Sequence, residues 1–269
     1  MLEKNLSIIQ NHILFNDERG KKRLEHQKSY KGIPSIGKVF PNCHLYVNYK
    51  TKVFLNDIVE TYEKHIKNVH IYNNLEGPDF NWTAITLMLV KEANTPYVML
   101  ATEDRMFHKT TTEEFEKVMQ DIIDNNVYYM PIGKLDHLTV GTRYSTVEDL
   151  LKPTPVHGKT CIKQYKDSGK ELFLFEAKNA PVKMTSFSAD AIYKTDFLIN
   201  KLEEMVYKYG LKPYSPNARL AQNTSKYFED YYTDQYGKGI RQCGDMICAV
   251  PKKEIVVSDE TPGETLGTL

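Results

Sequence analysis

The sequence predicts an α/β fold in which a mixed, mostly parallel sheet is covered by helices on both faces. Strand-like and helix-like segments alternate from residue 6 to residue 104, an order typical of parallel strands joined by crossover helices. Between residues 133 and 183 the pattern changes to short β-like pieces separated by proline and glycine. Strand-like sequence returns at residue 186, so we expect the middle stretch to be an irregular or antiparallel insert.

Hydrophobic spacing distinguishes the helices from the strands in the first half of the chain. Ile58, Val59, Tyr62 and Ile66 recur at helical spacing, which places an apolar stripe on one helix face. Glycine and proline between residues 32 and 41 predict a loop. The expected strands are residues 6–15, 43–48, 68–72, 97–101 and 127–132. The expected helices are residues 21–30, 57–65, 82–93 and 112–125, the last opened by a capping box at 110–113.

The second half returns to the same alternation after the insert. Residues 186–194 are expected to rejoin the sheet as a strand, followed by a helix that Gly210 closes. A further helix is expected within residues 217–232, and a late strand at 247–251. The remaining residues, 252–269, are polar, and we expect a mobile tail there rather than a closing lid.

The composition excludes several classes of protein. The chain has 269 residues, and 35 basic residues balance 35 acidic ones, so it lacks the bulk field of a nonspecific nucleic-acid binder. Its four cysteines match no zinc or redox spacing, and we expect reduced thiols in an intracellular protein. No stretch approaches the roughly 18 uninterrupted apolar residues of a membrane span. The expectation is a cytoplasmic protein, with peripheral attachment to a membrane as an open alternative.

Polar residues follow four of the predicted strands. Residues 16–17 follow the first strand, Asn48 ends the second, residues 73–74 follow the third, and Glu103 with Asp104 follow the fourth. Because parallel strands have their carboxyl ends at one edge of the sheet, these residues should share that edge. Carboxylates there can hold a divalent cation, and the cation can hold a diphosphate. The sequence therefore predicts a nucleotide site.

Two motifs in this chain follow one another in a recognisable order. Phe80-Asn81-Trp82 opens an apolar helix, and the strand after it reads YVMLATEDRMF over residues 97–107. Later, SADAIYKTDFL at residues 188–198 is followed by Phe228-Glu229-Asp230. This order resembles the GT-A-fold glycosyltransferases, and within them the family-2-type enzymes of surface-polysaccharide assembly. Their corresponding motifs are N/G-W-S, Y-V-L-L-L-x-D/E-D-x-F, S-x-x-A-I-W-K-x-x-F-L and W-E-F-E. The resemblance covers residues 42–232.

The resemblance implies a GT-A-like, Rossmann-type mixed sheet flanked by helices, in a single domain over residues 1–251. Residues 1–132 would form the nucleotide-binding half, and residues 133–251 would form the acceptor half with the insert. The implied activity is transfer of a sugar from a nucleotide-sugar donor to an acceptor hydroxyl, with inversion and with help from Mn²⁺ or Mg²⁺. A glycan or a lipid-linked sugar is the implied acceptor, and a modified nucleic-acid base is less favoured.

Four residues are candidates for binding the donor. Asp104, helped by Glu103, would coordinate the cation on the diphosphate. The alternative is that these carboxylates cap a helix or pair with Arg105. Asn48 would read the nucleotide base, unless it only caps a turn. Trp82 would stack on a ring, unless it belongs to the hydrophobic core. Thr102 stands where the common D-x-D motif has its first acid.

Two acids are candidates for catalysis. Glu229 is the predicted general base, because an aromatic setting raises the pKa of a carboxyl group toward the range that suits proton removal. The alternative is that it is a surface acid on a tyrosine-rich helix. Asp230 on the same helix would point about 100° away. Asp190 would bind a hydroxyl group of the acceptor or the donor.

Two other functions remain open at this point. Nucleotidyltransferases also place acids at strand ends, but they need a glycine-rich basic loop after the first strand, and residues 16–20 do not supply one convincingly. A non-catalytic, carbohydrate-binding relic of the same fold would explain the altered acidic motif.

Overall fold

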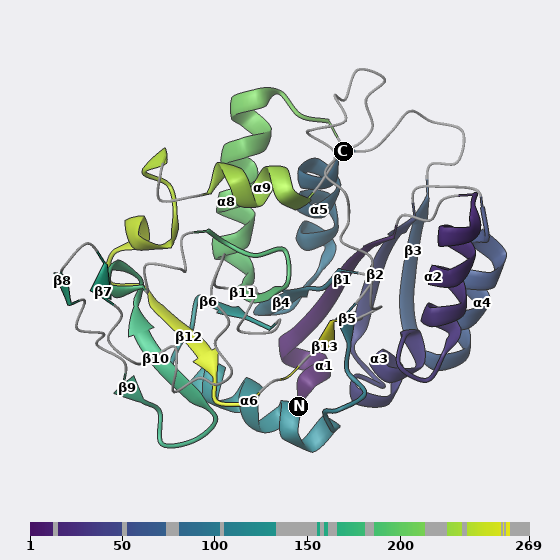
Figure 1. Ribbon diagram of the computed structural model, residues 1–269, viewed down its shortest axis with the longest axis horizontal. Coiled ribbons are helices and arrows are strands. Elements are labelled where there is room, and N and C mark those ends of the chain that lie inside the picture. Colours follow the sequence, from purple (N-terminus) through teal and green to yellow (C-terminus); the bar gives the residue numbers. More distant parts are fainter. Residues whose placement is uncertain are drawn as a thin grey trace.

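The computed structural model contains a nine-stranded mixed sheet with helices on both faces (Figure 1). The residues that it describes are 1–12, 16–49, 53–73, 81–102, 105–132, 155–156, 159–160, 166–180, 186–212, 225–232, 236–253, 255 and 257–258. Glu103, Asp104 and most of the expected insert lie outside these residues. The predicted mixed α/β fold is confirmed.

The first half of the chain supplies the parallel part of the sheet. Its strands stand in the order β3-β2-β1-β4, and each neighbouring pair is parallel. Ile8 of β1 aligns with Leu45 on one side and with Met99 on the other. The carboxyl ends of the four strands therefore meet at one edge. The elements are α1 (Leu2–Asn5), β1 (Leu6–His12), α2 (Glu18–Lys28), α3 (Ile33–Val39), β2 (His44–Tyr49), α4 (Leu55–His65), β3 (Asn68–Asn73), α5 (Trp82–Glu92) and β4 (Tyr97–Leu100).

The second half extends the same sheet with mainly antiparallel strands. β11 enters between β4 and β6 and runs antiparallel to both, so that Ala191 lies opposite Leu100 and Pro131. The sheet then continues through β12, β10 and β9. The elements are β5 (Arg105–Met106), α6 (Thr112–Asp124), β6 (Tyr129–Pro131), β7 (Pro155–Val156), β8 (Lys159–Thr160), β9 (Lys166–Asp167), β10 (Leu172–Glu176), β11 (Ala191–Lys194), α8 (Thr195–Tyr209), α9 (Ser225–Tyr231), β12 (Ile247–Pro251) and β13 (Val257–Ser258).

Alternation of side chains along the strands builds one hydrophobic core on each face of the sheet. On one face, Ile8 and Met99 belong to a core with residues of α3, α4 and α6. On the other face, Ile9 and Leu100 belong to a core with residues of α5 and α8. Figure 1 shows α5, α8 and α9 gathered on this second side. Both cores reach the carboxyl edge of β1 and β4, so the edge is supported from both faces.

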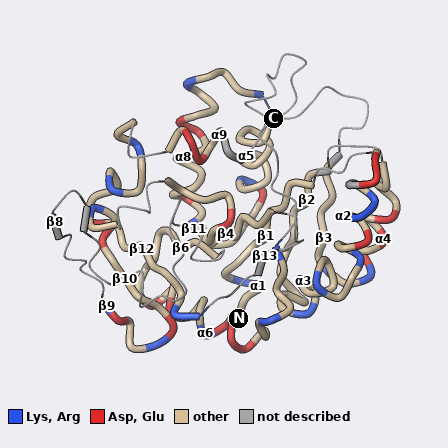
Figure 2. The backbone as a smooth tube through the Cα atoms, viewed as in Figure 1, with Lys and Arg blue, Asp and Glu red and all other residues tan. Residues whose placement is uncertain are grey.

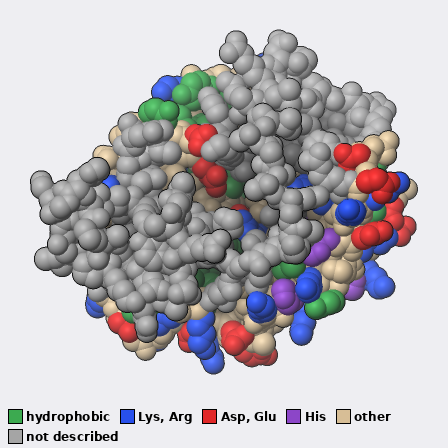
Figure 3. All heavy atoms as spheres, viewed as in Figure 1, with side chains coloured by type: hydrophobic (Ala, Val, Ile, Leu, Met, Phe, Trp, Pro, Cys, Tyr) green, Lys and Arg blue, Asp and Glu red, His purple; other side chains and the backbone are tan. Residues whose placement is uncertain are grey.

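Charged residues lie mainly outside the central strands. Figure 2 shows them on helices such as α2, α4 and α6 and on connecting segments, while β1, β2 and β4 are largely without charge. Figure 3 shows acidic and basic side chains interspersed along the margin of the described surface, as the equal numbers of the two signs suggest. None of the helices in the described ranges combines the length and the apolar character needed to cross a bilayer.

The prediction of a loop between residues 32 and 41 is wrong, because the helix α3 occupies most of this range. Pro34 stands in the first turn of α3, where a helix tolerates a residue without an N–H group. Gly37 faces α4, and a Cβ atom at this position would lie 2.1 Å from the carbonyl oxygen of His65. The proline that suggested a loop therefore lies in the first turn of α3, and the glycine lets α3 pack closely against α4.

The segment that follows β5 is tied to the C-terminal part of the chain. The predicted helix is confirmed as α6, but its capping box is formed by Thr111 and Glu114, one residue later than expected. Thr110 instead donates its hydroxyl to the carbonyl oxygen of Ile255, at 2.6 Å. Beyond Ile255, β13 pairs antiparallel with β5. Part of the segment that we expected to be a mobile tail is therefore packed against the domain.

Candidate active site

The candidate site lies at the edge of the sheet where β4 ends and β11 begins. Because β11 runs antiparallel to β4, the residue just before β11 lies beside the residues just after β4. That residue is Asp190, and β4 is followed by Ala101 and Thr102. The topology thus brings Asp190 to the strand end that leads into the predicted acidic motif.

Asp190 is held by three hydrogen bonds through its carboxylate. Its Oδ1 accepts from the backbone N–H of Thr102 at 2.7 Å and from the hydroxyl of Thr102 at 2.9 Å. Its Oδ2 accepts from Nη2 of Arg105 at 2.5 Å, in an ion pair whose two side chains are each only 10% exposed. Both carboxylate oxygens of Asp190 are therefore occupied by groups that flank Glu103 and Asp104 in the sequence.

Glu229 reaches the same segment from α9. Its Oε1 accepts from the backbone N–H of Ala189 at 2.7 Å, so Glu229 binds the residue that directly precedes Asp190 in the segment before β11. Helix α9 is fixed over α5, where Phe228 packs against Trp82 with their ring centroids 5.7 Å apart. Glu229 is partly exposed, whereas its neighbour Asp230 is exposed. The structure therefore joins Asp190 and Glu229 in one site.

Two buried tyrosines fix the backbone of Ser188, at the start of this segment. The N–H of Ser188 donates to the hydroxyl oxygen of Tyr129 at 3.1 Å, and the Ser188 carbonyl accepts from the hydroxyl of Tyr193 at 2.5 Å. Burial raises the pKa of both phenols well above the usual value, so they remain neutral hydrogen-bonding groups. The Ser188 hydroxyl oxygen in turn accepts from the N–H of Asp190 at 3.0 Å. These hydrogen bonds thus fix the segment that contains Asp190 and that Glu229 contacts at Ala189.

Asn48 lies near the carboxyl end of β2, on the face of the sheet that α5 covers. Its side chain is 1% exposed, and neither its amide nitrogen nor its amide oxygen has a hydrogen-bond partner among the described residues. Asn11 lies beside it in register on β1, donates to Thr86 at 3.2 Å and leaves its own Oδ1 without a partner there. Buried polar groups without partners are uncommon and costly, about 1–3 kcal/mol each. Asn48 therefore presents a donor and an acceptor that a ligand or water can satisfy.

The other predicted donor residues give a mixed outcome. Trp82 is 6% exposed and packs on Phe228 in the core, which agrees with the core alternative that the sequence left open. Its stacking on a donor ring stays a prediction. Glu103 and Asp104 lie outside the described residues, so their roles also stay predictions.

Sequence reasoning missed the residues that hold the site together. Thr102, Ser188 and Tyr129 contribute hydrogen bonds that belong to no recognised motif. Arg105 directly follows the acidic pair, and this position could have marked it as a residue of the candidate site. The sequence suggested it as a partner of Glu103 or Asp104, and that pairing stays a prediction because both acids lie outside the described residues. Among the described residues, Arg105 forms an ion pair with Asp190.

The described residues contain no group of three histidine, cysteine, aspartate or glutamate side chains that could hold a metal ion. Both carboxylate oxygens of Asp190 accept hydrogen bonds from Thr102 and Arg105. The predicted cation ligands, Glu103 and Asp104, lie outside the described residues. Two carboxylates and phosphate oxygens are a hard donor set that suits Mg²⁺ or Mn²⁺.

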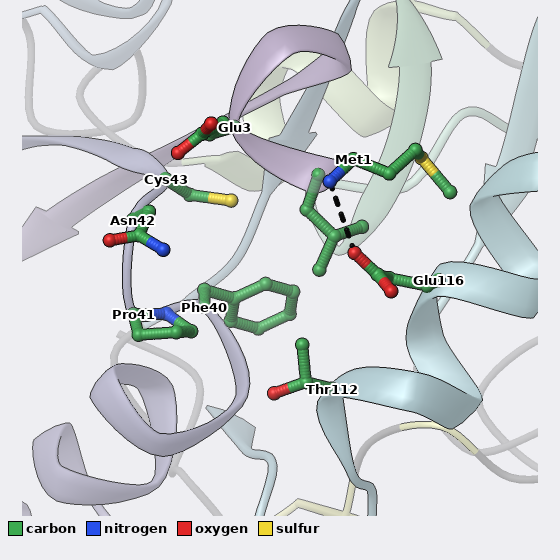
Figure 4. Close-up of a pocket in the computed structure, with 9 residues that line it drawn as sticks. Met1, Glu3, Phe40, Pro41, Asn42, Cys43, Thr112 and Glu116 are labelled. Atoms are coloured by element: carbon green, nitrogen blue, oxygen red, sulfur yellow. Dashed lines mark hydrogen bonds and ion pairs between the residues drawn. The ribbon is translucent and has the colours of Figure 1, made fainter.

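A pocket of about 100 Å³ lies on another part of the molecule. Figure 4 shows that it is lined by the N-terminal residues, by the segment before β2 and by the start of α6. The amino group of Met1 forms an ion pair with Glu116 there, at 3.2 Å. Because β2 (His44–Tyr49) starts beside this pocket and carries Asn48 near its other end, the pocket is at the opposite edge of the sheet from the candidate site.

No protein-family model matches this chain, and no curated protein matches it in sequence. The comparison of folds does find a similar solved structure, residues 1–349 of TarS from S. aureus, which is a glycosyltransferase. The alignment has a TM-score of 0.52 and 14% sequence identity, and it covers 94% of this chain and 60% of the TarS chain. This chain therefore spans less than two thirds of the matched structure. At this identity the similarity shows the fold alone, a large mixed sheet flanked by helices.

Proposed function

We propose that this protein transfers a sugar from a nucleotide-sugar donor to a hydroxyl group of a glycan or lipid-linked acceptor. One observation carries the proposal. Asp190 accepts hydrogen bonds from Thr102, at the end of the strand that leads into Glu103 and Asp104. Glu229, which is distant from Asp190 in the sequence, accepts a hydrogen bond from the N–H of Ala189, the residue directly before Asp190. In a fold similar to that of a glycosyltransferase, this edge of the sheet is where ligands bind.

The candidate residues have different roles in the proposed reaction. Glu229 accepts the proton of the acceptor hydroxyl on its carboxylate. A single displacement by that hydroxyl would invert the anomeric centre of the transferred sugar. Asn48 offers its unsatisfied amide to the polar edge of the nucleotide base. A divalent cation held by Asp104 and Glu103 would neutralise the diphosphate leaving group.

The first test is donor binding to the purified protein. We expect one of the UDP-, GDP-, CMP- or dTDP-sugars, with Mn²⁺, to raise the melting temperature by about 5 °C or more at a hundredfold excess over Kd, because ligation at that ratio contributes about 2.7 kcal/mol. Differential scanning fluorimetry measures the shift, and the corresponding free sugars serve as controls. If no nucleotide sugar shifts the transition, a non-catalytic relic or another class of protein replaces this proposal.

The variant Asn48→Leu tests the donor role of Asn48. The Asn48 amide is buried and has no partner among the described residues. Replacing it by an apolar side chain of similar size should leave the free protein as stable or more stable, because the desolvation penalty disappears. The same change should weaken nucleotide binding by about tenfold, since the base loses two hydrogen bonds. Urea unfolding and calorimetric titration measure the two effects. A loss of stability without ligand would show that the amide is satisfied in the free protein and would remove Asn48 from the donor site.

A further inference from the structure

The side chain of Asp190 bridges the two residues that flank the predicted acidic pair. Its Oδ1 accepts two hydrogen bonds from Thr102, and its Oδ2 accepts one from Arg105. In addition, the N–H of Arg105 donates to the carbonyl oxygen of Thr102 at 3.1 Å. The interval between Thr102 and Arg105 is thus closed by one backbone bond and by one carboxylate. We call these three residues the Asp190 clamp.

The contacts of the clamp are strong ones for a protein. A hydrogen bond between a guanidinium group and a carboxylate is charge-assisted, and it gains strength when the groups are shielded from water. Here both side chains of the ion pair are 10% exposed. Removal of Arg105 would take the ion-pair partner away from the largely buried carboxylate of Asp190, which is costly. The pair therefore favours one arrangement of the chain around it.

The C-terminal part of the chain also contacts β5, the strand that contains Arg105. Ser258 and Val257 of β13 lie opposite Arg105 and Met106 of β5, and Figure 1 shows these two short strands side by side. Ile255, which precedes them, is 4% exposed, and its carbonyl accepts from Thr110. Arg105 is thus fixed through its side chain by Asp190 and through its backbone by β13. Three distant parts of the sequence meet at this residue.

We propose that Asp190 is a positioning residue, which sets the geometry of the donor-binding edge through Arg105 and Thr102, with β13 as a second brace. This inference rests on the proposed function, since it takes Glu103 and Asp104 to be donor-binding residues. It replaces the expectation that Asp190 binds a substrate hydroxyl directly. Its two carboxylate oxygens already serve the protein, and β13 makes the C-terminal segment part of the site.

Hydrogen exchange tests the clamp without any ligand. We expect Asp190→Asn and Arg105→Met each to accelerate amide exchange in residues 102–107 by about tenfold, while amides of β1 keep their protection. The double variant should exchange no faster than either single variant, because both remove the same interaction. Asp57→Asn, which breaks an exposed ion pair with Lys28, is the control and should change nothing there. Unchanged exchange in the single variants would overturn the inference.

Kinetics then separates positioning from direct catalysis. Asp190→Asn should raise the KM for the donor about tenfold and leave kcat at saturating donor within threefold, and Arg105→Lys should restore part of the loss seen in Arg105→Met. A fall in kcat with unchanged donor KM and unchanged exchange would make Asp190 a catalytic residue and overturn the inference. If Asp190→Asn does not fold, Thr102→Val removes one of the three bonds and leaves the ion pair. If wild-type protein binds no nucleotide sugar, the proposed function fails, and the exchange experiment alone decides whether the clamp exists.

Discussion

Replacing Glu229 by glutamine should lower kcat for glycosyl transfer by about 10²–10⁴-fold, the usual contribution of a general base. Glutamine keeps an oxygen that can accept the hydrogen bond from Ala189 N–H, which is 2.7 Å long in the wild-type protein. The segment before β11 should therefore keep its place, and the donor KM should change little. Steady-state kinetics with the donor found by thermal shift gives both constants.

The neighbouring acid on α9 provides the matched control. Asp230→Asn removes a carboxylate from the same helix, but Asp230 is exposed and points about 100° away from Glu229. We expect its kcat to stay within a few-fold of wild type. A larger loss in Asp230→Asn than in Glu229→Gln would transfer the role of base to Asp230.

The anomeric configuration of the product is an independent test of the same role. A single displacement with Glu229 as base inverts the anomeric centre, and proton NMR of the product distinguishes the two anomers. Net retention would require a second displacement and would take the base role away from Glu229. This experiment needs no variant, so it does not depend on how well Glu229→Gln folds.

The sequence predicted the elements whose pattern is local. The apolar run of β4, the helical stripe of α4 and the glycine that ends α8 with a positive φ of 59° were all visible in the sequence. Helix α3 was missed because the glycine in it was taken as a sign of a loop. Gly37 is required because α4 packs too closely for a Cβ atom at this position, and α4 lies many residues later in the sequence. A residue that serves a distant contact gives no local signal of that contact.

The same distinction explains what could be predicted of the candidate site. Glu229 and Asp190 were chosen for their motifs, and the structure brings them together. Their detailed contacts depend on the register between β4 and β11 and on the position of β13, which are properties of the sheet. For that reason the ion pair between Asp190 and Arg105 could not be read from spacing, although both residues stood in recognised motifs. Asn48 was predicted from its place at a strand end, but its unsatisfied amide became visible only with its surroundings.

Acid should destabilise this protein strongly through His12, the last described residue of β1. The ring is buried, with an exposed fraction of 1%, and its Nε2 is hydrogen-bonded to the hydroxyl of Tyr62. That hydroxyl donates its proton to the side-chain oxygen of Gln10, at 2.8 Å. Burial, helped by the positive charge of Arg23, lowers the pKa of His12 from 6.5 to about 3. The folded protein therefore keeps His12 neutral at pH values where the unfolded chain protonates it.

The sign of the effect follows from this difference in pKa. Below pH 6.5 the unfolded chain binds a proton at His12 that the folded protein does not bind until about pH 3, so stability falls as the pH falls through this window. Between pH 7 and pH 4 the loss is on the order of 3 kcal/mol. A domain has only about 5–15 kcal/mol in total, so this one histidine should account for much of the acid sensitivity.

The variant His12→Gln isolates this contribution, because glutamine can still hydrogen-bond to Tyr62 but does not titrate. We expect His12→Gln to be less stable than wild type at pH 7, and the gap in unfolding free energy to shrink by about 3 kcal/mol, or to reverse, by pH 4. His70 and His108, whose pKa values are also lowered mainly by burial, remain in both proteins and cancel in the comparison. His65→Gln, at the end of the helix that carries Tyr62, controls for the loss of a partly buried histidine. Urea unfolding at several pH values measures all three proteins, and parallel pH profiles for wild type and His12→Gln would refute a neutral, buried His12.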